Sequence, residues 1–337
     1  MLNLLDHSIV RCIVVIIGTK YPLKPFRYTV DQKTFRIYNV EVGGLGNNPT
    51  LLIGSLFYHG DKKVLDHDKG VFDKNAVKME IEEVDRLCGE YGMPYAIDVV
   101  ATTAKAMENY LTFLSDTTNC ILFIDGVSNE ARIRGYILAG ELGIQEKAVA
   151  NGIYLGASSE ELEAIRESRI QAVVLLAYDP HDTRKVLLPE RKLEIVKNEL
   201  LPTAERLGVS KVLVDTIVLD YGDMVTAATS MKVIKDALGL PVGLGPANIL
   251  GCVTGKNFGK EGATSIHTGI AIYLRMMGAD FIMYGPLKRA KYVVPGLATI
   301  DGILGYAAKL EGDKVPLEHP LNKTIRRLQR LFLQFQR

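Results

Sequence analysis

The chain has 337 residues, of which 47% are hydrophobic, and a formal net charge of +1. This length can bury one large core or two modest ones, and the near-zero charge gives no overall field that would favour nucleic acid or an acidic partner. The four cysteines, Cys12, Cys88, Cys120 and Cys252, are far apart and form no C-x-x-C pair, which argues against a zinc site or a disulfide framework and favours a reducing cytoplasm.

Residues 1–25 are expected to be an N-terminal extension outside the fold. Their apolar run at 13–17 follows Arg11 and falls far short of the ~20 residues needed to span a bilayer. The segment lacks a small-residue cleavage site with the usual spacing, so we do not expect a secretory signal. We interpret this segment as an upstream extension or as the result of a mis-chosen start codon.

Residues 26–310 are predicted to form one domain that begins with a β-hairpin. Segment 26–43 alternates apolar and polar residues around a polar turn at 31–33, which is typical of a hairpin and suits the closed bottom of a barrel.

From residue 50 onward, strand and helix patterns alternate. Strands are expected at 51–56, 95–100, 121–124, 148–151, 172–177, 212–215, 241–244 and 281–284. Helices are expected at 74–91, 103–117, 130–142, 160–168, 189–207, 222–238, 262–277 and 287–310. Eight such units, without a G-x-G-x-x-G after the first strand, predict a closed (β/α)8 TIM barrel rather than an open dinucleotide-binding sheet.

Residues 311–337 are expected to form a separate basic tail. Large apolar residues recur there at the spacing of one helix face: Ile325, Leu328, Leu331, Phe332 and Phe335. The charges from residue 322 onward are all basic, so we predict an amphipathic helix. Such a face most often packs against protein, and we expect it to dock on its own barrel or on a partner subunit rather than on a membrane.

Each of four predicted strands is followed, at its carboxyl end, by one polar residue. These residues are Asp125, Asn151, Asp215 and Asn248. Any one of them is explained equally well as a helix cap, but all four ends meet at one mouth of a parallel barrel. Before Asn248, Gly243 and Gly245 allow close backbone approach or a positive φ, and Gly245 is assigned to the same binding site.

This set of carboxylates and amides favours a ligand whose edge presents ring N–H and amino donors beside a carbonyl, as a reduced pterin does. A divalent metal is the competing ligand, with His59, His181 and Asp98 as additional groups. No H-x-H or H-x-x-x-H spacing concentrates the imidazoles, so we expect no metal in this chain.

Six motifs follow one another along the chain: PTLLIGSLFYH at 49–59, DKGVFDK at 68–74, FIDGVS at 123–128, LVDT at 213–216, PVGLGP at 241–246 and MYGP at 283–286. With them, residues 26–310 resemble the H subunit of tetrahydromethanopterin S-methyltransferase and its relatives that move methyl groups between tetrahydrofolate and corrinoid proteins. The resemblance implies a pterin-binding barrel of the dihydropteroate-synthase-like type. It also implies that Asp125, Asn151 and Asp215 hold the pterin and that Asn248 lies near the reacting N5.

The activity implied by this resemblance is methyl transfer between an N5-methyl-tetrahydropterin, tetrahydromethanopterin foremost, and the cobalt of a corrinoid on a partner protein. Asn248 and Asp215 are the expected catalytic residues. Expected partners are the corrinoid protein or subunit, other methyltransferase subunits and a second copy in a homodimer, with no nucleic acid and at most indirect membrane contact. The chain reads Asp-Gly-Val-Ser at 125–128 where relatives read Asp-Ser-Thr-Ser, which leaves the choice of partner open.

Three other functions stay open. One is a methylcorrinoid:tetrahydrofolate methyltransferase that acts with a separate corrinoid protein. Another is a pterin-condensing synthase, for which Lys288, Arg289 and Lys291 are candidate pyrophosphate ligands, although no glycine-rich phosphate loop is present. The last is a non-catalytic assembly subunit, which only the basic tail supports.

Overall fold

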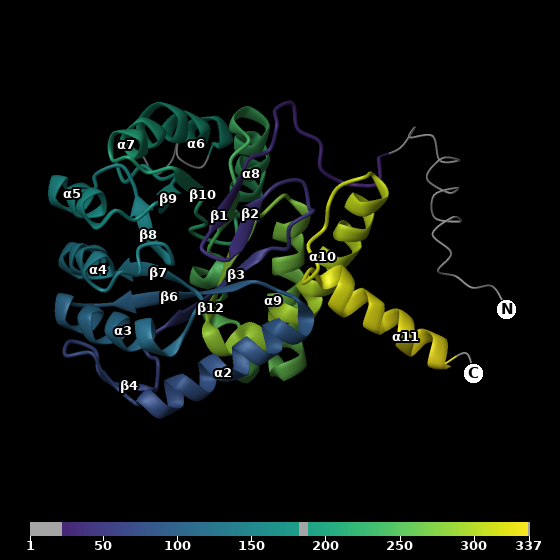
Figure 1. Cartoon of the computed structure of the whole chain (residues 1–337), viewed down its shortest axis with the longest axis horizontal. Coiled ribbons are helices and arrows are strands. Elements are labelled where there is room, and N and C mark those ends of the chain that lie inside the picture. Colours follow the sequence, from purple (N-terminus) through teal and green to yellow (C-terminus); the bar gives the residue numbers. More distant parts are fainter. Residues whose placement is uncertain (1–21, 182–187, 336–337) are drawn as a thin grey trace.

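The computed structural model describes residues 22–181 and 188–335, so most of the predicted N-terminal extension lies outside the described residues. Eight parallel strands close into a barrel in the order β10-β11-β12-β3-β6-β7-β8-β9, with helices around the outside (Figure 1). The strands are β3 (Leu51–Leu56), β6 (Tyr95–Ala101), β7 (Ile121–Gly126), β8 (Ala148–Ile153), β9 (Ala172–Leu176), β10 (Lys211–Asp215), β11 (Val242–Leu244) and β12 (Phe281–Pro286). All eight predicted strands are present, and the predicted (β/α)8 barrel is confirmed.

The outer helices follow the predicted order. They are α2 (Lys74–Tyr91), α3 (Ala104–Thr117), α4 (Asn129–Glu141), α5 (Ser159–Ser168), α6 (Pro189–Ile195), α7 (Leu201–Arg206), α8 (Met224–Leu238), α9 (Gly255–Met276) and α10 (Ala290–Leu310). A π-helical segment, η2 (Val196–Leu200), joins α6 to α7. Helix α9 begins earlier than predicted, and Gly259 interrupts it with a φ of 70°, a value that glycine adopts without steric cost.

Apolar side chains fill the inside of the barrel and the layer between strands and helices. The interior is built from alternate strand residues such as Ile53, Phe123, Val149, Val174 and Leu213, while their neighbours in the strands face the helices. Because both faces of each strand are buried, the strands read as near-continuous apolar runs. A polar residue in such a strand is therefore conspicuous.

An antiparallel hairpin of β1 (Thr34–Ile37) and β2 (Val40–Gly43) covers the N-terminal end of the barrel. Ile37 and Val42 are fully buried and belong to the interior cluster. The predicted hairpin and its place at the bottom of the barrel are thus confirmed.

The predicted position of the hairpin turn is wrong. The turn lies at Tyr38 and Asn39, where Tyr38 has a positive φ of 50°, rather than at 31–33. Residues 31–33 are held against the end of α8 instead: the Lys33 N–H donates to the Gly239 carbonyl (2.7 Å), and the Gln32 amide donates to the Lys235 carbonyl (2.9 Å). Their polarity serves a tertiary contact, which local periodicity does not distinguish from a turn.

Helix α10 is long and apolar enough to cross a membrane by length and composition. Half of its most apolar stretch is buried in the protein, where α10 packs against α9 and α2 as the last barrel helix. This burial explains its composition as that of a core helix.

The C-terminal tail is helical, as predicted, but most of its apolar face is not docked. A short π-helical segment, η6 (Leu321–Ile325), packs on α10, where Ile325 lies over Gly302. Helix α11 (Arg326–Phe335) then points away from the barrel (Figure 1), and Leu328, Phe332 and Phe335 are exposed. The expectation that this face docks on its own barrel is therefore wrong beyond residue 325.

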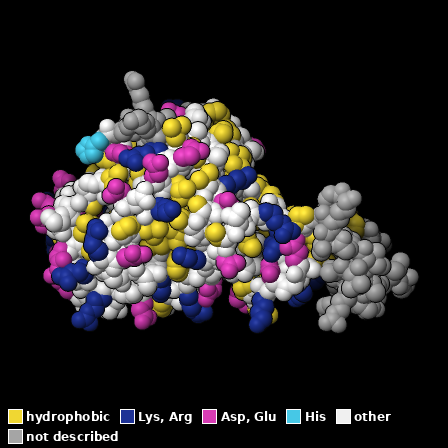
Figure 2. Space-filling model, turned by 90° about the horizontal axis from the view of Figure 1, so that it is seen from above, with side chains coloured by type: hydrophobic (Ala, Val, Ile, Leu, Met, Phe, Trp, Pro, Cys, Tyr) yellow, Lys and Arg dark blue, Asp and Glu magenta, His cyan; other side chains and the backbone are white. Residues whose placement is uncertain are grey.

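Charges of both signs are interspersed with hydrophobic side chains on the face shown in Figure 2. This face has no extended region of a single sign, which fits the net charge of +1.

Candidate functional site

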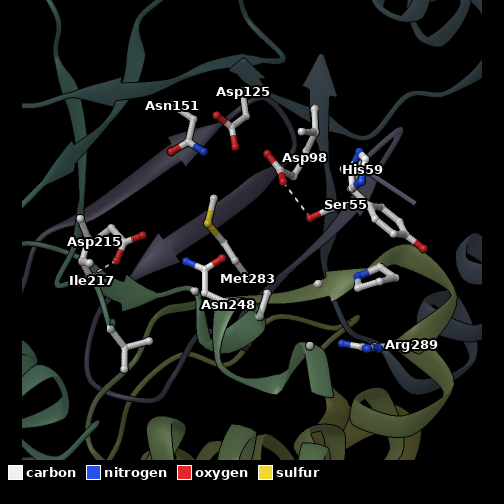
Figure 3. Close-up of a pocket in the computed structure, with 18 of the residues that line it drawn as sticks. Ser55, His59, Asp98, Asp125, Asn151, Asp215, Ile217, Asn248, Met283 and Arg289 are labelled. Atoms are coloured by element: carbon white, nitrogen blue, oxygen red, sulfur yellow. Dashed lines mark hydrogen bonds between the residues drawn. The ribbon is translucent and has the colours of Figure 1, made fainter. Parts of the chain in front are cut away.

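A cavity of about 620 Å³ opens at the mouth formed by the carboxyl ends of the barrel strands. All eight strands or the turns after them contribute lining residues, including Ser55, Asp98, Asp125, Asn151, Leu176, Asp215, Asn248 and Met283 (Figure 3). The structure thus brings together all five residues that the sequence assigned to the site, Gly245 included. His59 lines the rim, whereas the buried His267 contacts the Val253 carbonyl outside the cavity (3.0 Å).

Asp215 ends β10 with its carboxyl group buried on the cavity floor (6% exposed). One oxygen accepts a hydrogen bond from the Ile217 N–H at 2.7 Å. Burial raises the pKa of Asp215 to about 6, although the Ile217 N–H and the Lys192 ammonium both favour the charged form. Near neutral pH the carboxylate is available to accept hydrogen bonds from a ligand.

Asp98 and Asp125 come from neighbouring strands and share a poorly solvated part of the floor (Figure 3). Burial and the nearby Asp125 raise the pKa of Asp98 well above its usual range, against a hydrogen bond from the Ser55 hydroxyl (2.8 Å). Burial also raises the pKa of Asp125 to about 6, while Arg132 opposes the rise. Two adjacent buried carboxyl groups resist simultaneous ionisation, which is why the pKa of Asp98 lies above that of an exposed aspartate.

The sequence interpretation considered Asp98 only as a metal ligand and did not include Ser55. The signal for Asp98 was present, because it is the single charged residue of the strand Tyr-Ala-Ile-Asp-Val-Val-Ala. In the described residues no three metal-ligating side chains group together, and the contact that the structure shows for the Asp98 carboxyl group is the hydrogen bond from Ser55.

Two buried polar atoms in the cavity lack a hydrogen-bond partner in the described structure. They are Oδ1 of Asn151 and Oδ1 of Asp98. A buried polar atom without a partner costs about 1–3 kcal/mol, so both atoms indicate where a bound ligand supplies hydrogen bonds.

Asn248 lies on the 3-10 turn η3 (Pro246–Asn248) and is exposed at the mouth. Its amide faces the cavity near Met283 (Figure 3). Gly243 permits this path, because a Cβ there would lie 2.2 Å from the Phe281 carbonyl oxygen. Gly245 has a negative φ, and a Cβ there would make an ordinary contact with the Met283 side chain at 3.5 Å, so it lines the cavity without packing that demands glycine.

Lys192, in α6, forms hydrogen bonds to the turn that follows Asp215. Its buried ammonium donates to the carbonyl oxygens of Thr216 and Ile217, the second at 2.9 Å, and burial lowers its pKa to about 8. The same turn supplies the Ile217 N–H that holds Asp215. Lys192 is therefore a positioning residue for Asp215, although nothing in the local sequence connects the two.

Replacing Lys192 with Met is expected to weaken ligand binding about tenfold, because the turn loses a buried charged donor worth about 1.5–3 kcal/mol. Loss of the nearby cation also raises the pKa of Asp215 further, which moves the pH of half-maximal binding upward. Calorimetric titration across pH measures both effects. Lys192→Arg is expected to restore the pH profile in part, and the exposed Lys197→Met is the matched control; an unchanged profile in Lys192→Met contradicts this role.

Asp215 is also expected to destabilise the ligand-free protein as the pH rises. A raised pKa gives a stabilising contribution that is complete below about pH 4 and is lost as the pH rises through about 6. Asp215→Asn has no carboxyl group and so does not lose this contribution. The unfolding free energy of Asp215→Asn minus that of the parent chain is therefore expected to be about 2 kcal/mol larger at pH ~7.5 than at pH ~4.5. Urea unfolding at both pH values measures the difference, with the exposed Asp85→Asn as control; an equal effect at both pH values refutes the assignment.

Of the three cations considered for a pyrophosphate, only Arg289 lines the cavity. Lys288 and Lys291 are exposed to solvent. A single half-buried guanidinium at the rim gives little support to a condensing synthase, which has to hold a highly charged leaving group.

The closed eight-stranded barrel, with buried carboxyl and amide oxygens at one mouth, belongs to the class of TIM barrels. Solved structures of dihydropteroate synthases share the fold. The Yersinia pestis enzyme matches with a TM-score of 0.53 and 12% identity over 80% of this chain and 98% of its own. The Vibrio fischeri enzyme matches with a TM-score of 0.53 and 15% identity, covering 84% and 99% of the two chains.

The family model of the tetrahydromethanopterin S-methyltransferase MtrH subunit matches residues 30–315, and the chain belongs to this family. The H subunit of this methyltransferase from Methanothermobacter thermautotrophicus is 32% identical over 310 residues, which cover 89% of this chain and all of the relative. The H subunit from Methanopyrus kandleri is 30% identical over 314 residues, covering 87% and 97%. The predicted family and the predicted class of enzyme, a methyltransferase, are confirmed.

Proposed function

We propose that this chain transfers a methyl group between the N5 of a methyl-tetrahydropterin, tetrahydromethanopterin foremost, and the cobalt of a corrinoid carried by a partner protein. The observation that carries the proposal is the cavity floor, where Asp125, Asn151 and Asp215 converge and two buried oxygen atoms, one on Asn151 and one on Asp98, lack partners among the described residues. The donors of a reduced pterin edge complement this set.

The ring is held by residues on different strands. Asp215 and Asp125 accept from ring N–H and amino groups, and the Asn151 amide supplies both an acceptor and donors. Because these side chains end rigid strands, they orient the ring so that its N5 side faces Asn248 at the mouth.

Methyl release requires that positive character builds on N5, since an unassisted amine anion is a poor leaving group. The Asn248 amide, directly or through water, donates to N5 more strongly as the C–N bond breaks. Asp98, whose pKa is raised by burial and by Asp125, adds a further carboxyl group to the floor. A reduced cobalt ion supplies the nucleophile when the corrinoid protein is docked.

The mouth also suits a macromolecular partner. Large apolar side chains are exposed on loops after the strands: Val127, Leu188, Leu219 and Tyr221, with Phe258 at the start of α9. Exposed apolar groups around a functional cavity are typical of a docking surface. The relatives are named as subunits, and we propose that this chain likewise works beside other subunits, one of them carrying the corrinoid. The homodimer and the cytoplasmic location remain predictions.

Methyl transfer to free cob(I)alamin under anaerobic conditions tests the proposal. N5-methyl-tetrahydromethanopterin and N5-methyl-tetrahydrofolate are assayed in parallel, and the expected result is turnover with the first above the second. Faster turnover with the folate identifies the chain as a methylcorrinoid:tetrahydrofolate methyltransferase instead. Pterin binding without transfer from either donor refutes catalysis and favours an assembly role.

A further inference from the structure

Helix α11 presents a continuous apolar face to solvent. Leu328, Leu331, Phe332 and Phe335 recur at i, i+3, i+4 and i+7, and their exposed fractions rise from 48% to 95% along the helix. A single exposed apolar residue is ordinary, but four on one helix face indicate a binding surface.

The charged residues of the segment that carries this face are all cations. Between residues 320 and 337 the chain has Lys323, Arg326, Arg327, Arg330 and Arg337 and no acidic residue. Arg327 pairs with Glu90, and Lys323 lies 2.7 Å from Glu318, in exposed pairs. Such pairs contribute little and exchange readily with other anions. The occupant of this face is therefore expected to be both apolar and anionic.

Two protein occupants fit less well. A second copy would bring two cation-only helices together, and like charges oppose that contact. Any partner protein shared by the whole family would be expected to contact the shared part of the chain, whereas the family match ends at residue 315 and α11 lies beyond it.

Leu and Phe on one face with Arg and Gln on the other is the pattern of helices that lie in the surface of a bilayer. The fold also leaves α11 free to do so. Its base is fixed, since the Thr324 hydroxyl donates to the Tyr91 carbonyl (3.1 Å) and Ile325 packs over Gly302, while the helix itself points away from the barrel (Figure 1).

We propose that α11 attaches this protein to an anionic lipid surface, with its apolar face in the interface and its arginines near the headgroup phosphates. The contact is peripheral, because one short helix inserts only to the headgroup boundary. It replaces the sequence-based expectation of at most indirect membrane contact for this part of the chain, and it is independent of the chemistry at the barrel mouth.

Vesicle co-sedimentation of the full chain tests the proposal. The partition coefficient is expected to be about tenfold higher on phosphatidylcholine vesicles with about one third phosphatidylglycerol than on pure phosphatidylcholine. Raising the salt from about 0.1 M to about 0.5 M is expected to remove most of this difference, because it screens the arginines. Equal binding to both vesicles, or no binding to either, overturns the proposal, and the second result leaves a protein as the occupant of the face.

Substitutions test the contributions of the apolar face and of the arginines separately. Leu331→Glu with Phe332→Glu is expected to abolish binding, and Arg326→Gln with Arg330→Gln is expected to remove the preference for anionic lipid. Met79→Glu alters an exposed apolar residue on α2 and is expected to bind as the parent chain does. All of these residues are exposed, so circular dichroism is expected to show unchanged folding. Parent-like binding by the Leu331 and Phe332 variant would show that the apolar face is not used.

Discussion

Asn248→Ala is expected to slow methyl transfer to cob(I)alamin about ten- to hundredfold, while the dissociation constant of the pterin changes much less. The amide is exposed at the mouth, faces the cavity and has no hydrogen-bond partner among the described residues, so its removal leaves no buried group unsatisfied. Its hydrogen bond to N5 strengthens as the methyl group leaves, and an interaction made mainly in the transition state affects kcat rather than binding. A loss of about 1.5–3 kcal/mol of transition-state stabilisation corresponds to this range.

Single-turnover measurement with saturating pterin isolates the chemical step from docking of the corrinoid protein. Asn75→Ala, an exposed asparagine in α2, is the matched control and is expected to keep the parent rate. A rate within about twofold of the parent chain, under ~0.5 kcal/mol of barrier, would show that Asn248 is a cap or spacer and that another group assists N5.

Asp215→Ala is expected to weaken pterin binding about ten- to hundredfold. The carboxylate is buried on the floor and accepts only the Ile217 N–H within the described structure, so its other oxygen is available to the ring donors. A hydrogen bond to a charged group is worth about 1.5–3 kcal/mol, and its loss appears directly in the dissociation constant.

Calorimetric titration at pH ~7.5, above the raised pKa of Asp215, measures this effect. Asp215→Asn keeps an acceptor for the Ile217 N–H. It therefore shows whether Asp215→Ala binds more weakly only because the turn misfolds. It is expected to bind more weakly than the parent chain, since it loses the charge. Asp85→Ala on α2 is the control, and an unchanged dissociation constant in folded Asp215→Ala would remove Asp215 from the binding role.

Local sequence patterns were enough to predict the barrel and most of the cavity floor. Strands buried on both faces are continuous apolar runs, and glycines such as Gly92 and Gly239 end helices in the left-handed conformation, so each βα unit is visible locally. Asp125, Asn151 and Asp215 stood out because each interrupts or ends such a run. Parallel topology then places all of these ends at one mouth.

Features that depend on distant neighbours required the folded structure. The pKa of Asp98 is raised because the group is buried and because β6 lies beside β7 and places it near Asp125. Lys192 reaches the turn after Asp215 because α6 packs beneath it. The polar residues 31–33 contact α8 instead of turning, and α11 remains exposed. Periodicity reports which face of an element is apolar, but the partner of that face, and the pKa of a buried group, depend on packing between segments far apart in the chain.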